Sequence, residues 1–572
     1  MIQQSCFRFI CFIPPDTTNN MTKIFGFSEF LASLALLVVI FTVSDFRYKF
    51  RISVAPIPLY GVTFFIISLT GFGSLLSDLW VGQKWWVIKS ELEIRLMFQS
   101  FLGVLFLGCF IVWNYYAFIN PPKFGKRNHE RYLGVLYNII LKGNNNELAV
   151  AADELGNSAE IIIENSGKIT DKKNTSSIKN TANNIILLLA NRKFCKVIVS
   201  NSPLTAYLIF QAISKKDKYD IPAYQFSAIV SEEALLNKDS VIYHENDAYS
   251  SGLMGYTKQW SKAIYGDSVL IDNFEQYHLS PFSINYKAFY KFDSIQWEAY
   301  GRLICIYLDD LCLREEHLVH SHSFSSALSN YEHCTNNSYK LNENINDELR
   351  SELINRVSVA TDLVRNIFST VHKRNTNTSF IKNQAESKKD PYPKDISDSI
   401  AEMMLNIIFN ATQIKVKDFT LWHVHHNIIW EGFFGCTSFY NNENRSVLYK
   451  KTKGKLIRLM YEEIKQIDGM PNYKNTRIAG YLLNVCGLKF GSTHSTRKYK
   501  DLTFLKDMTL KIVQRKYLSL ANEMPEIADN MLVGGLSFDE VNNKLVKTYA
   551  KLLTKTANKD ILDLDPPLTK TS

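Results

Sequence analysis

Histidines gather in two short stretches of the sequence. The first, REEHLVHSHSF (residues 314–324), contains His317, His320 and His322, and the second, WHVHHN (residues 422–427), contains His423, His425 and His426. Neutral imidazole nitrogens are good ligands for zinc, iron and copper. If the two stretches meet in the fold, we expect a divalent transition metal as the cofactor. The motif support is weak, because H-E-x-x-H is absent and Glu275-x-x-His278 is the single Glu-x-x-His in the chain.

A structural interpretation competes with the metal site. A helix predicted from residue 294 places His317 and His320 on one face, and His322 would need a break after about residue 320. A protonated histidine near a helix C-terminus interacts favourably with the helix dipole. We therefore interpret residues 314–324 as the polar end of a helix, and keep the metal site as the alternative that needs residues 422–427 nearby.

A second candidate site is the loop HENDAYSSG (residues 244–252). His244, Glu245 and Asp247 combine an imidazole with two carboxylates, which suits acid–base chemistry. The loop follows a predicted strand, and ligands of parallel sheets bind at the carboxyl ends of strands. The alternative is an ordinary polar loop, since its residues also favour turns. Neither a Walker A motif nor a G-x-G-x-x-G motif occurs in the chain, so the sequence gives no support for nucleotide binding through them.

The elements around this loop are predicted to form an α/β unit. Short β-branched or apolar runs predict strands at 195–200, 223–230 and 240–245, with helices at 201–216 and 231–237 between them. Strand–helix–strand order favours a parallel sheet.

From residue 294 onward the apolar spacing is helical. Trp297, Tyr300, Ile304, Tyr307, Leu308 and Leu311 form one stripe. Further helices are predicted at 346–372, 396–411, 417–434, 446–467, 474–489, 498–523 and 537–554. The last of these would begin with a capping box between Ser537 and Glu540. Residues 373–394 read as a linker or loop, and residues 560–572 as a flexible tail.

Three long apolar runs precede these predicted elements in the chain. Residues 24–43, 57–76 and 98–119 each have about the 20 residues that a helix needs to cross a bilayer. Basic residues, which prefer the cytoplasmic side, lie between the first two runs and directly after the third. We expect three spans in a bacterial inner membrane, with the N-terminus outside and the C-terminal region in the cytosol. Residues 1–23 are expected to be disordered, or partly an artefact of the assigned start, because Met21 precedes the first span.

The cysteine pattern bears on the cellular compartment, and the net charge bears on the possible binding partners. The nine cysteines are scattered without a C-x-x-C pair, as is typical of a reducing compartment. A net charge of +9 over 572 residues is too dilute to indicate nucleic acid by itself. A basic cluster could contact anionic lipid headgroups or remain a solvated face, and it consists of Lys450, Lys451, Lys453, Lys455 and Arg458. The spans could also associate into a homo-oligomer.

These observations predict a multi-domain membrane protein. Its predicted parts are an N-terminal segment (1–23), a three-helix transmembrane anchor (24–119), an α/β region (120–293), a helical region (294–372), the linker (373–394), a helical C-terminal region (395–559) and the tail (560–572). An anchor without a recognisable catalytic motif favours a membrane-anchored sensor/effector or interaction protein. A membrane-tethered hydrolase, with or without a metal ion, and an oligomeric channel are the alternatives, and whether the chain is an enzyme stays open.

Overall fold

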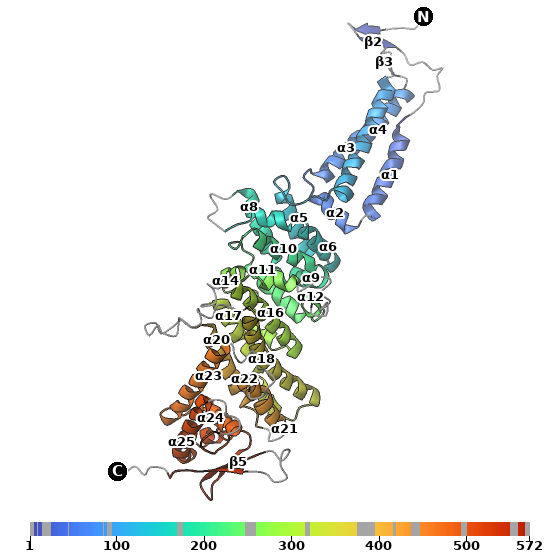
Figure 1. Ribbon diagram of the computed structural model, residues 1–572. Helices are drawn as coiled ribbons and strands as arrows, with labels where there is room; N and C mark the ends of the chain where they lie inside the picture. Colours follow the sequence, from blue (N-terminus) through green and yellow to red (C-terminus); the bar gives the residue numbers. More distant parts are fainter. Residues whose placement is uncertain are drawn as a thin grey trace. The chain divides into compact units, whose positions relative to one another are not determined.

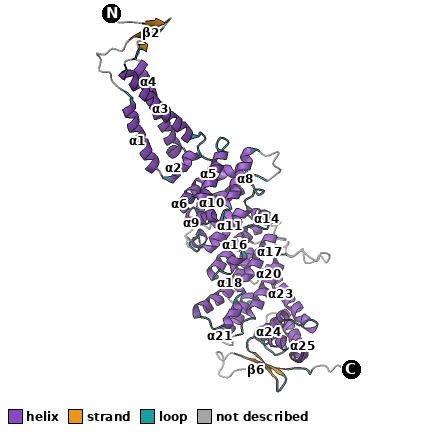
Figure 2. Cartoon of the chain, turned by 180° about the vertical axis from the view of Figure 1, so that it is seen from behind, coloured by secondary structure: helices purple, strands orange, loops and turns teal. Residues whose placement is uncertain are grey.

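The computed structural model shows a chain that is mostly helical (Figures 1 and 2). It describes residues 5–7, 10–13, 24–43, 45–83, 85–88, 94–168, 176–245, 259–314, 321–374, 395–415, 419–435, 447–492, 500–549 and 559–566. The chain divides into two compact units, Met1–Phe226 and Ser227–Ser572. His317, His320 and Asp247 lie outside the described residues, and so do residues 375–394 of the predicted linker.

Three apolar helices form a bundle in the first unit. They are α1 (Phe27–Val43), α3 (Leu59–Gly82) and α4 (Ile94–Asn114), and α4 continues as the π-helix η1 (Tyr115–Ile119). Two stretches, Leu59–Trp80 and Leu96–Ile119, are long and apolar enough to cross a membrane. The first predicted run forms α1, which has 17 residues and is shorter than these two. Joined across their 104° bend, Arg192–Asn201 and Pro203–Lys215 also pass by length and composition. Both pack against α6 (Asn145–Gly156), however, and bury one face there.

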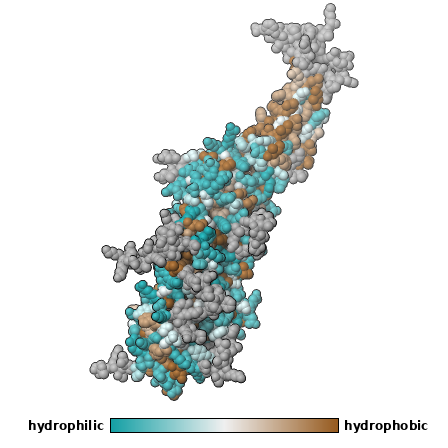
Figure 3. Space-filling view, viewed as in Figure 1, coloured by the Kyte–Doolittle hydropathy of each residue, from teal (hydrophilic) through white to brown (hydrophobic). Residues whose placement is uncertain are grey.

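Large apolar side chains cover the outside of this bundle (Figure 3). Phe64 is 74% exposed, Phe72 is 67% exposed and Val104 is 68% exposed. Contiguous apolar surface of this kind is unfavourable in water and marks a surface that meets lipid or another apolar partner. Inside the bundle the helices approach closely, because Gly71 faces the ring of Phe30 and Gly73 faces Leu102.

Polar contacts join the helix ends at one end of the bundle. The backbone N–H of Phe27 donates to Asp78 Oδ2 (3.0 Å), which ties the start of α1 to the last turns of α3. The amide of Gln99, on α4, donates to Ser77 Oγ (3.1 Å). Strands occur before α1 and after α3. Strand β2 (Ile10–Ile13) pairs antiparallel with β1 (Ser5–Phe7) and with β3 (Val87–Ile88). The N-terminal segment, where no ordered element was expected, therefore contains two short strands.

Short helices make up the rest of the first unit. They are α2 (Phe46–Ser53), α5 (His129–Lys142), α6, α7 (Ala159–Asn165), α8 (Ser177–Leu189), α9 (Arg192–Asn201) and α10 (Pro203–Lys215). Asn144 and Glu147 form a capping box at the start of α6.

The predicted α/β unit is wrong. Residues 195–200 belong to helix α9, residues 224–236 form one helix, α11 (Tyr224–Leu236), and residues 241–244 form the short helix α12 (Val241–His244). In α11 the buried residues Phe226, Val230 and Ala234 recur every four positions, which is a helical period. A short apolar run has no periodicity that separates a buried strand from a buried helix, and here helical partners decide the outcome.

The second unit is a helical assembly with a small sheet. Its helices are α12, α13 (Gln259–Tyr265), α14 (Ser268–Glu275), α15 (Tyr286–Phe289), α16 (Ser294–Leu313), α17 (His322–Tyr331), η4 (Glu332–Thr335), η5 (Ser338–Asn342), α18 (Asp347–Lys373), α20 (Ile396–Ala411), α21 (Phe419–Trp422), the π-helix η7 (His423–Trp430), α22 (Glu431–Phe434), α23 (Val447–Lys465), η10 (Gln466–Asp468), α24 (Tyr473–Cys486), α25 (Lys500–Glu523) and α26 (Pro525–Asp529). Helices α16 and α18 pack along each other, as do α20 and α23. The whole predicted stripe of α16, from Trp297 to Leu311, is buried, which confirms that interpretation.

The predicted helix at 537–554 is also wrong. This segment forms the strands β4 (Leu536–Asp539) and β5 (Lys544–Thr548), and β6 (Lys559–Asp563) joins them in an antiparallel sheet of order β4-β5-β6. The Asp539 side chain accepts from the backbone N–H of Asn542 (3.2 Å), and Asn543 has a left-handed backbone with φ 52°. Residues 540–543 connect the two strands, and asparagine tolerates the left-handed backbone that this turn requires, so turn formation outweighs the capping box.

Candidate functional site

The first histidine stretch lies between two helices. Helix α16 ends at Leu313, earlier than predicted, and His322 is the exposed first residue of α17. Ser321 caps α17 by accepting from the Phe324 N–H (2.9 Å). Of the three histidines, only His322 is among the described residues.

A buried hydroxyl–carboxylate network adjoins this start of α17, and no motif in the sequence predicts it. Tyr307 donates to Asp272 Oδ1 (2.8 Å) and lies 2.6 Å from Ser321 Oγ, while Ser323 Oγ also donates to Asp272 Oδ1 (2.6 Å). Burial, with the Asp272 charge, raises the pKa of Tyr307 well above its ordinary value. Tyr307 is therefore a neutral hydrogen-bond donor at pH 7, and the network fixes α14, α16 and α17 to one another.

The second histidine stretch is a π-helix with a fully buried centre. His425 is 0% exposed, its Nε2 lies 3.0 Å from the Ala411 carbonyl, and its Nδ1 lies 3.3 Å from Asn484 Nδ2. The Gly535 N–H donates to Asn484 Oδ1 (3.1 Å), which orients the amide so that its NH₂ faces His425. His425 thus accepts at Nδ1 and donates at Nε2. Burial lowers its pKa to about 4, so the ring is neutral at pH 7.

The two flanking histidines have other neighbours. The His426 ring stacks on Trp422 with centroids 5.7 Å apart, and burial together with the nearby Lys547 charge lowers its pKa to about 3. His423 Nδ1 lies 3.2 Å from Asn427 Nδ2. Among the residues that the structure describes, no group of three or more His, Cys, Asp or Glu side chains could hold a metal ion.

The C-terminal sheet brings a lysine into the same interior. Lys547 is 2% exposed, donates from Nζ to the Asn484 carbonyl and lies 4.3 Å from the centre of the Tyr549 ring. Burial lowers its pKa to about 8, against the opposing effect of Cys486 and Asp560. The Tyr549 hydroxyl in turn donates to Asp560 Oδ2 (2.6 Å). The Gly534-Gly535 pair, where the backbone approaches the Asn484 side chain, was the signal in the sequence for this close packing.

The predicted acid–base loop begins with a helix cap. Glu245 accepts from the N–H groups of Trp260 (2.6 Å) and Ser261 (3.2 Å) and from Ser261 Oγ (2.5 Å) at the start of α13. His244 is the last residue of α12. In the described residues Glu245 therefore satisfies the orphan N–H groups of a helix N-terminus.

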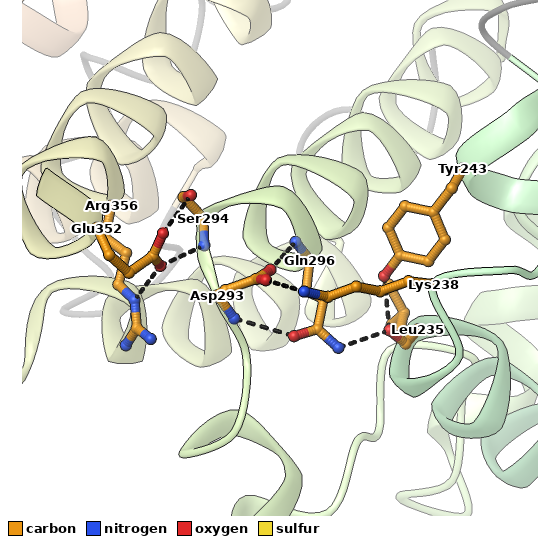
Figure 4. A network of polar contacts seen from close by, with 8 residues as sticks. All are labelled: Leu235, Lys238, Tyr243, Asp293, Ser294, Gln296, Glu352 and Arg356. Atoms are coloured by element: carbon orange, nitrogen blue, oxygen red, sulfur yellow. Dashed lines mark hydrogen bonds and ion pairs between the residues drawn. The ribbon is translucent and has the colours of Figure 1, made fainter. Parts of the chain in front are cut away.

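A second polar network surrounds the start of α16 (Figure 4). Asp293 and Gln296 form a capping box, and the Gln296 amide donates to the Leu235 carbonyl (3.0 Å). On the other side, Glu352 accepts from the N–H (2.6 Å) and hydroxyl (2.7 Å) of Ser294 and pairs with Arg356 (2.9 Å). Lys238 and Tyr243 complete the network through Asp293 and the Leu235 carbonyl. Every described member has a structural partner, so the network positions α16 against α11 and α18.

Most of the basic cluster at 450–458 faces the protein itself. Asp395 accepts from Lys451 (2.5 Å) and Lys455 (2.7 Å), and Lys453 is buried beside the rings of Phe434 and Tyr449. Burial alone would raise the pKa of Asp395, but the lysine and Ser397 hydrogen bonds hold it well below its usual range. Lys450 is exposed, and Arg458 is exposed beside Glu462 (2.8 Å).

The bundle meets the short helices of the first unit at a polar junction centred on α2. Arg51 pairs with Glu154 of α6 (2.7 Å) and donates to the Ala117 carbonyl (2.9 Å), and Glu154 is 4% exposed. The Asn128 amide donates to the Val54 carbonyl (2.6 Å). Under these contacts lies a small apolar core made of Ile52, Ala55, Leu59, Trp113 and Ala117. The loop between the first two apolar runs and the residues after the third are thus packed together.

No protein-family model matches this chain, and neither does any curated protein or solved structure.

Proposed function

We propose that this chain is an integral membrane protein with three spans, α1, α3 and α4, and a large cytosolic helical region. The exposed apolar surface of the bundle supports the membrane assignment. Helix α1 would be about 26 Å long at 1.5 Å per residue, close to the roughly 30 Å hydrocarbon core. The apolar run begins just before the helix, at Ile24 and Phe25.

The contacts of the loops support an odd number of spans. Residues 45–55 pack with residues 117–154, so both belong on one side of the membrane. Strand β2 pairs with β3, and the Phe27 N–H donates a hydrogen bond to Asp78. The N-terminal segment and the second loop therefore belong on the opposite side of the membrane. Basic residues at 47–51 and 123–131 lie on the side that residues 45–55 and 117–154 share, and the positive-inside rule assigns that side to the cytosol.

Reporter fusions to the intact chain test this topology. An alkaline phosphatase at the C-terminus should be inactive and a green fluorescent protein there should fluoresce, whereas a phosphatase inserted near residue 90 should be active. Phosphatase activity at the C-terminus would overturn the three-span topology.

We further propose that the protein is a membrane-anchored sensor/effector. The carrying observation is the buried Arg51–Glu154 pair, which docks the helical region on the anchor. A flexible tether needs no buried contact of this kind, whereas a device that transmits a change in the bilayer does. Helices α2 and α6, joined by the pair, are the elements that would move.

Hydrogen exchange of the full-length chain in nanodiscs tests the sensor. Bilayers of 14-carbon and 18-carbon acyl chains should give different amide protection in α6, because mismatch changes helix tilt. The difference should vanish in Arg51→Gln and persist in Lys215→Gln, whose pair with Glu160 is exposed. Equal protection of α6 in both bilayers would contradict the sensor while leaving the topology intact.

A further inference from the structure

Three exposed cations lie where the chain leaves the bundle and enters the short helices of the first unit. Lys123, Lys126 and Arg127 are all exposed, and no hydrogen bond or ion pair within the described residues engages their side chains. The carboxylate that follows them in the sequence, Glu130, accepts from Ser177 Oγ (3.3 Å). The three positive charges therefore have no dedicated counter-charge in the described part of the chain.

Two arginines of the same junction are used differently. Arg51 pairs with Glu154, and Arg131 donates to the Ala55 carbonyl, so both hold the fold together. The three exposed cations make no such contact with the described residues. Their charge is thus left over from folding and is available to a partner outside the chain.

A buried scaffold holds these cations in place. Phe124 is buried, and its N–H donates to Ser158 Oγ (3.1 Å). The buried Asn128 side chain accepts from the Gly125 N–H (2.8 Å) and donates to the Lys123 carbonyl (3.0 Å). The turn closed by these bonds carries the other two cations at its tip. A preorganised site of this kind loses little conformational entropy when it binds.

Exposed apolar side chains precede the turn at the end of the last span. Phe118 is 51% exposed and Ile119 is 74% exposed. Lys123 follows Ile119 by four residues, so it lies at most about 14 Å from the end of the span, the reach of four extended residues. With this span in a bilayer, positive charge lies at headgroup depth and apolar surface at acyl-chain depth. A phospholipid matches both surfaces, whereas a soluble anion matches the first alone.

We propose that the turn at residues 123–127 binds the phosphate headgroup of an anionic phospholipid, whose acyl chains pack on Phe118 and Ile119. The site rests on the membrane assignment proposed above. The Arg127 guanidinium presents a fork of N–H donors that matches phosphate oxygens, and the two lysines add point charges. Basic residues directly after a span attract the anionic lipids of the cytosolic leaflet. Because the turn is bonded to Ser158, a bound lipid also holds the following helices close to the bilayer.

Native mass spectrometry of the full-length chain tests this lipid site. The protein is released from nanodiscs that contain equal amounts of phosphatidylglycerol and phosphatidylcholine, and the retained lipids are counted. We expect phosphatidylglycerol to be enriched at least about tenfold, since each basic residue near the surface adds to the attraction. Equal retention of the two lipids would overturn the proposal. Both leaflets of a nanodisc carry the lipid, so the result is the same whichever side is cytosolic, and a failed topology would leave it unchanged.

Variants separate this site from general charge attraction. Combining Lys123→Gln, Lys126→Gln and Arg127→Gln should bring the enrichment toward one, and these exposed side chains leave no buried contact broken. The charge-preserving pair Lys123→Arg and Lys126→Arg should retain the enrichment. A matched control removes the same charge at three exposed lysines of the second unit, through Lys287→Gln, Lys291→Gln and Lys511→Gln. This control should also retain the enrichment, and equal loss in the two triple variants would refute the site.

Trypsin distinguishes a lipid from a soluble anion. Adding phosphatidylglycerol to phosphatidylcholine nanodiscs should slow cleavage at residues 123–127 by about fivefold, because a bound headgroup occupies the side chains that trypsin must bind. Cleavage after the exposed Lys287 in the same sample corrects for the concentration of trypsin near a charged bilayer. Excess inorganic phosphate in phosphatidylcholine nanodiscs should give no protection. Protection by phosphate equal to that by the lipid would assign the turn to a soluble anion and overturn the lipid site.

Discussion

The two ring nitrogens of His425 have different partners, and these partners fix its charge. Nδ1 accepts from Asn484 and Nε2 donates to the Ala411 carbonyl, so the ring holds one proton. A second proton would require a buried cation beside an Asn484 NH₂ group that can only donate. The folded protein therefore resists protonation of His425, and its pKa is lowered to about 4.

This lowered pKa predicts that the second unit loses stability in mild acid. The unfolded chain takes up the proton near pH 6.5 and the folded chain near pH 4, so the stabilisation is complete above pH 6.5 and is lost as the pH falls toward 4. The loss should approach about 3 kcal/mol for the 2.5-unit difference in pKa. In His425→Gln, thermal unfolding should depend less steeply on pH over this window. His423→Gln is the matched control, and equal pH slopes in the two variants would contradict the prediction.

At the scale of secondary-structure elements, the confirmed predictions are those for long segments with a clear helical period of apolar residues. Residues 396–411 form α20 as predicted, and residues 346–372 form α18 to within one residue. Both show several turns of helical period and an asparagine or aspartate cap, so the local signal is redundant. Residues 195–200 offered only CKVIVS, which fits a strand by propensity. Asn191 caps this segment as a helix and α6 and α10 bury its apolar face, contacts that a local pattern cannot contain.

The candidate sites were harder to predict than the helices. The histidines can be located in the sequence, but the hydrogen-bond partners of His425 are residues 411 and 484, which are far apart in the chain. Such tertiary juxtapositions leave no periodic trace.

Helix α24 packs against the turn after α26 without space for a side chain at Gly480. A Cβ there would lie 2.1 Å from the Met531 carbonyl oxygen, a backbone atom that cannot swing away. Gly480→Ala should destabilise the second unit by about 1–3 kcal/mol or more, as overpacking does. Gly454→Ala, in an exposed position of α23 with no atom within 4 Å of the new Cβ, should instead stabilise by about 0.5–1 kcal/mol. Denaturant unfolding of the two variants measures the contrast, and similar shifts would show that the α24 contact is looser than described.

At the scale of the whole chain, the anchor and helices α5 to α10 belong to one compact unit, Met1–Phe226. Arg51 lies in the loop between the first two apolar runs, yet its partner Glu154 follows the third run. Removing one member of a buried ion pair leaves the other charge without compensation, which typically costs about 3–5 kcal/mol, while removing both is far less costly. The junction therefore predicts a specific pattern among variants.

Trypsin can report on this junction, because Lys123, Lys126 and Arg127 lie in the segment that it holds in place. Phe124 and Asn128 are buried there, so cleavage needs local opening. In the full-length chain in nanodiscs, Arg51→Gln and Glu154→Gln should each speed cleavage at residues 123–127 by at least about tenfold, given the cost of an unpaired buried charge. The double variant should return toward the parent rate, and Lys215→Gln, which breaks an exposed pair with Glu160, should stay close to it. If the single and double variants were cleaved equally fast, the pair would be adding nothing to the docking, and the anchor would have to be regarded as a tether.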